Sequence, residues 1–249
     1  PAQLRLDHQR HALEQPGHFI LLLVRWHIAY APVLVERSMH PEWLSNAYLV
    51  ADGEGGEAVF VDSGAPTLPL LTVAERWNVR PRCILRTHAH ADHVEHEAEL
   101  GLPVLTGALE LGGLKVDAIP TPGHSDDHIT FLFKGAVCFT GDVLFKDAVG
   151  GGDPDRVRAS VMKLMELPPD TRVLPGHTEA TTIGREWDEN PFVRVWRGVE
   201  PEGSERCRVG DREGTIVVWS PDYDGKGKAW VRFDDGGGRI LGGSHIERL

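Results

Sequence analysis

The sequence is poor in cysteine and contains no long run of apolar residues. Its 249 residues include only three cysteines, at positions 83, 138 and 207. Because three scattered thiols cannot build a disulfide framework, they indicate reduced cysteines and a cytoplasmic protein. The longest apolar run, residues 19–24, is far shorter than the roughly 20 residues of a membrane span. It is also too short for a secretory signal, so we expect a strand or a buried segment there.

Positive charge is also scarce. The chain carries 26 Lys and Arg residues against 37 Asp and Glu residues, which gives a formal net charge of −11. Such a field repels phosphate backbones, so we do not expect a nucleic-acid partner. The short apolar run gives no reason to expect a membrane partner. The partner expected from the motifs below is a small-molecule substrate. Apolar residues at 41% and charged residues at 25% exclude a disordered chain. The oligomeric state is left open.

Short apolar runs alternate with helical periodicity in the middle of the chain. Strands are predicted at residues 47–50, 58–61, 83–85, 114–119, 128–133, 136–140 and 172–174. Helices are predicted around residues 70–77 and 157–165. From about residue 200, glycine-rich turns separate short β-rich runs at 215–219, 229–233 and 239–241. We therefore predict an N-terminal segment of unclear role (1–40), an α/β catalytic domain (41–199) and a small β-rich domain resembling a barrel (200–249).

Histidine and aspartate are concentrated directly after the strand predicted at 83–85. His88, His90, Asp92 and His93 lie within six consecutive positions, which is denser than structural use explains. Neutral imidazoles and carboxylates are good ligands for zinc or iron. In an extended segment His88 and His90 point to one side, whereas the adjacent Asp92 and His93 diverge. One segment can therefore supply ligands to two metal ions.

Three further turns each present one chemically active side chain after a strand. They are Pro122-Gly123-His124, Thr140-Gly141-Asp142 and Pro175-Gly176-His177. Each motif is weak alone, because a single histidine on a loop is usually solvated. In this order, and together with the first cluster, they indicate one composite metal site. His128, four residues after His124, is left open between lining the pocket and lying in the core or on the surface.

The order His-x-His-x-Asp-His, Pro-Gly-His, Thr-Gly-Asp and Pro-Gly-His resembles the metallo-β-lactamase superfamily. The resemblance covers roughly residues 45–195 and is greatest to glyoxalase II (hydroxyacylglutathione hydrolase) and its bacterial relatives. It implies a four-layer αββα sandwich, to which the β-rich segment would be appended. An aspartate at position 142, where many true β-lactamases of this fold have cysteine, argues against antibiotic hydrolysis as the main role.

The resemblance also implies the metal ligands and the catalytic groups. It implies His88, His90 and His124 for a first ion, Asp92, His93 and His177 for a second, and Asp142 between the two. Asp92 and Asp142 would be the catalytic carboxylates. The cofactors would be two divalent ions, zinc first, with iron or manganese as alternatives. Asp62 is either the partner that fixes a ligand imidazole or a simple cap at the end of a strand.

These features predict a metal-dependent hydrolase acting on a thioester of the hydroxyacylglutathione type. Two ions about 3.5–4 Å apart lower the pKa of a shared water to about 7, and the bridging hydroxide would attack the carbonyl. The leaving thiolate, with a pKa of about 8.5, needs no dedicated acid. Glyoxalase II carries a lysine and a tyrosine soon after the bridging aspartate to hold glutathione, and a helical C-terminal domain. Here residues 149–153 read Val-Gly-Gly-Gly-Asp, and the C-terminal segment is β-rich.

Three alternative functions stay open at this point. His88, His124 and Asp142 form the two-histidine, one-carboxylate set that suits a single iron, as in the related persulfide dioxygenases. A lactonase or a phosphodiesterase would use the same dinuclear site. The non-enzyme alternative is a metal-stabilised binding module. Metal content separates iron from zinc, and activity after Asp142→Asn separates an enzyme from a scaffold.

Overall fold

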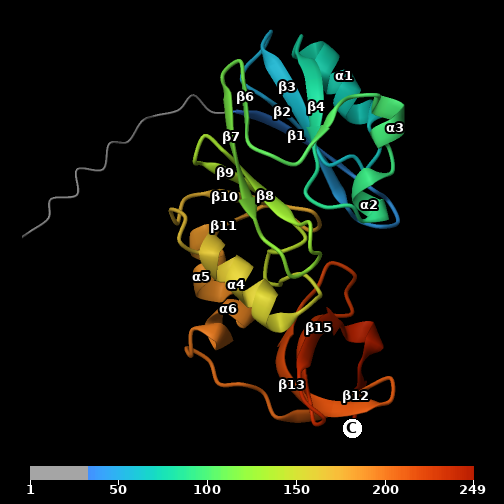
Figure 1. Cartoon of the computed structure of the whole chain (residues 1–249), viewed down its shortest axis with the longest axis vertical. Helices are drawn as coiled ribbons and strands as arrows, with labels where there is room; N and C mark the ends of the chain where they lie inside the picture. The colour runs from blue at the N-terminus through green and yellow to red at the C-terminus, as the bar shows by residue number, and fades with distance from the viewer. Residues whose placement is uncertain (1–32) are drawn as a thin grey trace, which may run out of the picture. The chain divides into compact units, whose positions relative to one another are not determined.

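A computed structural model describes residues 33–249 of the chain (Figure 1). The apolar run at residues 19–24, and with it most of the segment 1–40, lies outside the described residues. Residues 34–39 of that segment form the first strand of a sheet. Within the described part, no helix has the length and apolar character needed to cross a membrane.

The first sheet contains five strands in the order β1-β2-β3-β4-β5. Their bounds are Leu34–Met39, Asn46–Ala51, Glu57–Val61, Arg80–Leu85 and Val104–Leu105. The first three strands pair antiparallel, whereas β3, β4 and β5 are parallel neighbours. Three short helices belong to this half of the fold: α1 (Leu68–Arg76), α2 (Ala91–Val94) and α3 (Glu97–Leu100).

The second sheet contains six strands in the order β11-β10-β9-β8-β7-β6. In chain order, β6 to β11 are Leu109–Leu111, Leu114–Pro120, Ile129–Phe133, Val137–Gly141, Arg172–Pro175 and Thr181–Thr182. Strands β9 and β10 are parallel, and the other pairs are antiparallel. Its helices are α4 (Pro154–Leu164), α5 (Ile183–Glu189) and α6 (Pro191–Trp196).

Alternation along the strands builds the layers. On β2, Tyr48 and Val50 enter a core between the two sheets, whereas Leu49 faces the opposite side and packs with Leu70 of α1. On the second sheet, Phe139 joins the core between the sheets, and other residues pack against α4 and α6. The result is helix, sheet, sheet, helix, so the predicted αββα sandwich is confirmed.

The glycine-rich C-terminal segment forms a third, antiparallel sheet in the order β15-β14-β13-β12-β16. In chain order, β12 to β16 are Glu205–Val209, Arg212–Ser220, Lys228–Phe233, Gly238–Gly242 and Glu247–Arg248. A 3₁₀ turn at Gly243–His245 precedes β16. The sheet is strongly curled in Figure 1, with β15 and β16 as its two edges. Val217, Val218 and Ile240 join the same core as α4 and α6, so this sheet is packed against the second sheet's helices.

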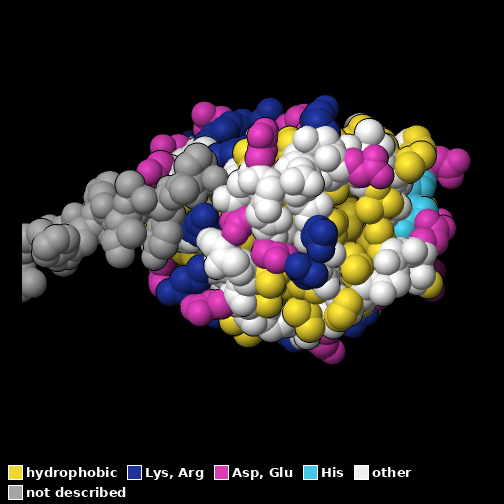
Figure 2. All heavy atoms as spheres, turned by 90° about the horizontal axis from the view of Figure 1, so that it is seen from above, with side chains coloured by type: hydrophobic (Ala, Val, Ile, Leu, Met, Phe, Trp, Pro, Cys, Tyr) yellow, Lys and Arg dark blue, Asp and Glu magenta, His cyan; other side chains and the backbone are white. Residues whose placement is uncertain are grey.

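The surface mixes apolar and charged side chains. On the face seen in Figure 2, apolar side chains gather across the middle, with histidine side chains at one margin beside acidic ones. Lysine, arginine and acidic side chains are interspersed elsewhere on this face.

Candidate metal centre

The seven side chains predicted as ligands lie together at one end of the two central sheets. They stand on segments that follow four strands. His88 and His90 lie on the loop after β4, and Asp92 and His93 lie in the short helix α2 that follows it. His124 follows β7, Asp142 follows β9, and His177 follows β10. Since β9 and β10 run parallel, the loops after them meet at the same edge of the second sheet. Ser45, before β2, bridges to His177, so the edges of both sheets meet at the site.

Three imidazoles form the first group. His90 Nδ1 lies 3.1 Å from His88 Nε2 and 2.9 Å from His124 Nε2. His88 is buried, His124 is half-buried and His90 is exposed. Burial lowers the pKa of both His88 and His124, although the Asp142 carboxylate acts in the opposite direction. His88 and His124 are therefore neutral nitrogen donors, and the exposed His90 extends the group to solvent.

A carboxylate and two buried imidazoles form the second group. Asp92 Oδ2 lies 3.3 Å from His177 Nε2 and 3.7 Å from His93 Nε2. Burial opposes charge on both imidazoles, but the carboxylates of Asp142 and Asp92 together raise the pKa of His177 to about 9. The pKa of His93 is raised in the same way, with Asp62 adding a hydrogen bond. The carboxylates therefore draw positive charge to this side of the centre.

Asp142 lies between the two groups. Its Oδ2 is 3.7 Å from His124 Nε2 and 3.4 Å from His177 Nε2, and its Oδ1 is 3.3 Å from His93 Nε2. Burial alone raises the pKa of this carboxyl, yet the charges of His177 and His93 hold it well below its usual range. Asp142 Oδ1 and His93 Nε2 are buried and have no hydrogen-bond partner in the described part of the chain. Buried polar atoms are rarely left unpaired, so this donor set fits a bound cation.

The outer nitrogens of three imidazoles are held by the protein. His93 Nδ1 lies 2.9 Å from Asp62 Oδ2, His124 Nδ1 lies 2.9 Å from the Gly151 carbonyl, and His177 Nδ1 lies 3.0 Å from the Leu44 carbonyl. If Nδ1 donates in each pair, the lone pair of Nε2 faces the centre, which is the tautomer a metal requires. Asp62 also accepts hydrogen bonds from the Thr87 amide and hydroxyl. Asp62 therefore holds an imidazole of the cluster, as one of the two predicted roles requires.

Two of these partners have an unusual backbone conformation. Leu44 has φ of 59° and Asp62 has φ of 56°, a region that side chains other than glycine rarely occupy. Such conformations cost of order 1–3 kcal/mol and persist where the surrounding structure enforces them. Here the surroundings are the His177 and His93 imidazoles that the two residues contact. A glycine is also required at position 176, because a Cβ there would collide with Asp142 Oδ1.

His128 supports the centre from the core. Its side chain is 1% exposed, its Nε2 accepts the Asp142 amide at 2.9 Å, and its Nδ1 lies 2.8 Å from Thr121 Oγ1. Burial lowers the pKa of His128 to about 3, so the ring stays neutral. Of the two positions left open for it, the structure places His128 in the core, where it fixes the backbone of Asp142.

Sequence reasoning did not single out Tyr223, which comes from the loop between β13 and β14. Its ring stacks on that of His177, with centroids 4.1 Å apart and planes inclined by 5°. It also lines a cavity of about 350 Å³ together with Met39 and Leu44. Nothing in the local sequence could have indicated this contact, because it depends on how the third sheet packs against the rest of the protein.

Comparison with known proteins gives the same family as the motifs. A model of the Metallo-beta-lactamase superfamily matches residues 101–177. An uncharacterized protein of Mycobacterium leprae is 31% identical over 202 residues, covering 59% of this chain and 93% of the relative. A Haemophilus influenzae protein named hydroxyacylglutathione hydrolase GloC is 28% identical over 196 residues, covering 59% of this chain and 92% of the relative.

A solved structure supports the same assignment of the fold. The structure described as TTHA1623 in a di-iron-bound form is 35% identical, with a TM-score of 0.53. The match covers 62% of this chain and 98% of that one. Each of these matches covers more than nine-tenths of the similar protein but leaves more than a third of this chain unmatched. This chain therefore contains segments that these proteins lack.

Proposed function

This chain belongs to the metallo-β-lactamase superfamily, and we propose that it is a dinuclear metal-dependent hydrolase whose substrate is a thioester. One observation carries the proposal: two groups of donor atoms converge on either side of a single buried carboxylate, Asp142. Such an arrangement is suited to two cations that share a ligand. The relative named hydroxyacylglutathione hydrolase supports an acyl thioester as the substrate class.

The proposed ligands divide as the sequence motifs suggest. His88, His90 and His124 would hold one ion, Asp92, His93 and His177 the other, and Asp142 would contact both. Zinc is the expected metal, with iron or manganese as alternatives, and the similar di-iron structure supports an occupancy of two. When bound, two such ions lower the pKa of a water molecule and polarise a carbonyl group.

The protein's own groups orient the reaction. Asp92 and Asp142 both present an oxygen to His177 Nε2, so we assign these carboxylates to orient the attacking water. Asp62 and the Leu44 carbonyl keep the imidazoles of His93 and His177 in place. The leaving group is a thiolate with a pKa of about 8.5, so it departs without a proton donor.

Metal content and turnover of S-lactoylglutathione, measured on one preparation, test the proposal. We expect about two zinc, iron or manganese ions per chain together with thioester hydrolysis. One iron per chain with oxygen consumption on glutathione persulfide would replace the hydrolase with a dioxygenase. Two ions without thioester turnover would move the substrate to lactones or phosphodiesters. Bound metal without turnover of any of these substrates would favour a binding module.

A further inference from the structure

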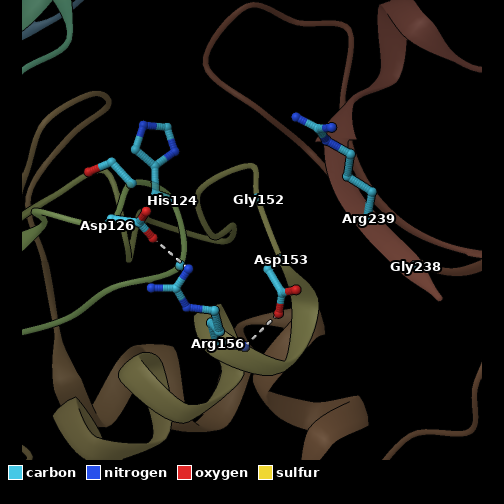
Figure 3. Close-up of a pocket in the computed structure, with 9 residues that line it drawn as sticks. His124, Asp126, Gly152, Asp153, Arg156, Gly238 and Arg239 are labelled. Atoms are coloured by element: carbon cyan, nitrogen blue, oxygen red, sulfur yellow. Dashed lines mark hydrogen bonds and ion pairs between the residues drawn. The ribbon is translucent and has the colours of Figure 1, made fainter.

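A polar cavity of about 390 Å³ adjoins the metal centre on the side of His124 (Figure 3). One wall comes from the loop that carries His124, and another from the start of α4, which contributes Arg156. The third sheet lines its opposite side with Gly238 and Arg239 at the start of β15. Because the cavity is lined by His124 itself, a molecule bound there lies next to the reacting groups.

Two backbone hydrogen bonds attach β15 to the centre. The Gly152 amide donates to the Ile240 carbonyl at 2.8 Å, and the Ile240 amide donates to the Gly152 carbonyl at 2.9 Å. The preceding carbonyl, that of Gly151, accepts from His124. Gly152 has φ of 150°, and a Cβ there would collide with the Gly123 carbonyl, so only glycine permits this approach. The position of Arg239 is thus tied to that of His124.

Gly152 therefore has a structural role, because its two backbone hydrogen bonds attach β15 of the third sheet beside His124. Residues 149–153 carry no cationic side chain themselves, but the strand that they attach carries Arg239.

Arg239 differs from the other arginines of its sheet. Ion pairs to carboxylates engage five of them: Arg206, Arg208, Arg212, Arg232 and Arg248. The Arg239 side chain makes no hydrogen bond or ion pair within residues 33–249, and Figure 3 shows its guanidinium on the cavity side of β15, across from His124. An unpaired guanidinium beside an active site is available to a ligand.

The remaining charges around the cavity are already engaged. Arg156 forms an ion pair with Asp126 at 2.6 Å, and the Asp153 carboxylate accepts the Arg156 amide at 3.0 Å as the cap of α4. The one charge of the lining left without a partner in the described chain is therefore positive. A guanidinium offers parallel N–H donors that match a carboxylate or a phosphate.

We propose that Arg239 binds an anionic group, a carboxylate or a phosphate, on the thiol portion of the substrate and so directs the acyl group to the metal centre. The third sheet is then the substrate-recognition element of this enzyme. This inference deepens the proposed function and rests on it for the identity of the ligand as a thioester.

Binding of stable thioethers to the metal-loaded protein tests the inference without turnover. The probes are S-methylglutathione, which carries carboxylates, S-methyl-coenzyme A, which carries phosphates, and S-methylpantetheine, which carries neither. We expect Arg239→Ala to weaken at least one charged probe about tenfold, as for loss of one charge-assisted hydrogen bond. The affinity for S-methylpantetheine should change less than about twofold. Isothermal titration calorimetry gives these dissociation constants.

A matched variant controls for the general loss of positive charge. Arg232→Ala removes a guanidinium from the same sheet, but this arginine pairs with Glu202 and does not line the cavity. It should leave the affinities for all three probes unchanged. Loss with glutathione alone identifies a carboxylate ligand, and loss with coenzyme A alone identifies a phosphate.

Several outcomes would overturn the inference. They are failure of both charged probes to bind the wild-type protein, equal affinities in Arg239→Ala, and an equal loss for the neutral probe. These results are independent of catalysis. A protein that binds a charged probe through Arg239 yet does not hydrolyse the S-lactoyl thioester would contradict the proposed function alone.

Discussion

The metal centre and the third sheet are both rich in charged side chains, but these side chains differ in burial and in hydrogen bonding. In the sheet, arginines and carboxylates stand exposed and in pairs, as Arg206 does with Asp234. In the centre, Asp142 is 6% exposed and one of its oxygens has no hydrogen-bond partner in the described chain. Exposed ion pairs gain little over hydration, whereas a buried charge that is not compensated destabilises the fold strongly. The comparison teaches that a buried polar atom without a hydrogen bond, rather than charge itself, marks the metal centre.

The largest effect should come from neutralising the carboxylate that the two groups share. Asp142→Asn keeps the shape of the side chain but removes the charge that faces His93, His124 and His177. We expect hydrolysis to fall at least about 100-fold and the metal content to drop by about one ion per chain. Atomic absorption and a thioester assay measure both. Unchanged activity with full metal occupancy would show that Asp142 is not a shared ligand.

A smaller loss is expected when the support of a ligand is removed rather than a ligand. Asp62→Ala deletes the carboxylate that holds His93 Nδ1 and both polar groups of Thr87. Losing such a partner typically weakens metal affinity about 10–100-fold. Competition with a chromogenic chelator gives the affinity, and Asp62→Asn, which retains an acceptor oxygen, should lie between the variant and the wild type. An affinity in Asp62→Ala equal to that of the wild type contradicts this role.

The buried His128 should make the stability of the metal centre depend on pH. Burial lowers the pKa of His128 from 6.5 to about 3. Between pH 6.5 and pH 3, the imidazole is therefore protonated in the unfolded chain but neutral in the folded protein. The stability it contributes is therefore present above pH 6.5 and is lost as the pH falls toward 3, by up to about 1.4 kcal/mol per pH unit. His128→Gln keeps an acceptor for the Asp142 amide but does not titrate.

Urea unfolding of the metal-free proteins at pH 7 and pH 5 measures the difference. The free energy of unfolding of His128→Gln should fall about 2 kcal/mol less between the two pH values than that of the wild type. Equal falls in the two proteins would mean that His128 is already accessible to protons in the folded state.

Tyr223 connects the third sheet to the metal centre, because it lies on the loop between β13 and β14 and its ring stacks on that of His177. Tyr223→Ala removes the stack, and the loss of about 0.5–1.5 kcal/mol corresponds to a metal affinity about two- to twelvefold weaker. Tyr223→Phe retains the ring and should stay within about twofold of the wild type. The same chelator competition measures both variants, and a phenylalanine variant as weak as the alanine variant would assign the effect to the hydroxyl instead.

Local features made the sandwich and the cluster predictable. Each ligand directly follows a strand within a motif of a few residues, so His124, Asp142 and His177 could be recognised from the sequence. Contacts between distant segments could not. The stack of Tyr223 on His177 and the bonds from β15 to Gly152 depend on how the third sheet packs. Six strands were also missed: β1, β5, β6, β11, β12 and β16. Three of them, β5, β11 and β16, have two residues each, which is too few for an alternating pattern.

The smallest effect is expected at the exposed ion pairs of the third sheet. Arg206→Ala removes the partner of Asp234, but both side chains remain largely in water, where the ion pair gains little over hydration. The free energy of unfolding should equal that of the wild type within the precision of the measurement, and hydrolysis should not change at all. Urea denaturation and the thioester assay check these values. A loss of activity in Arg206→Ala would contradict the contrast drawn between the sheet and the centre. It would mean that an arginine in an exposed ion pair, and not only Arg239, acts on the substrate.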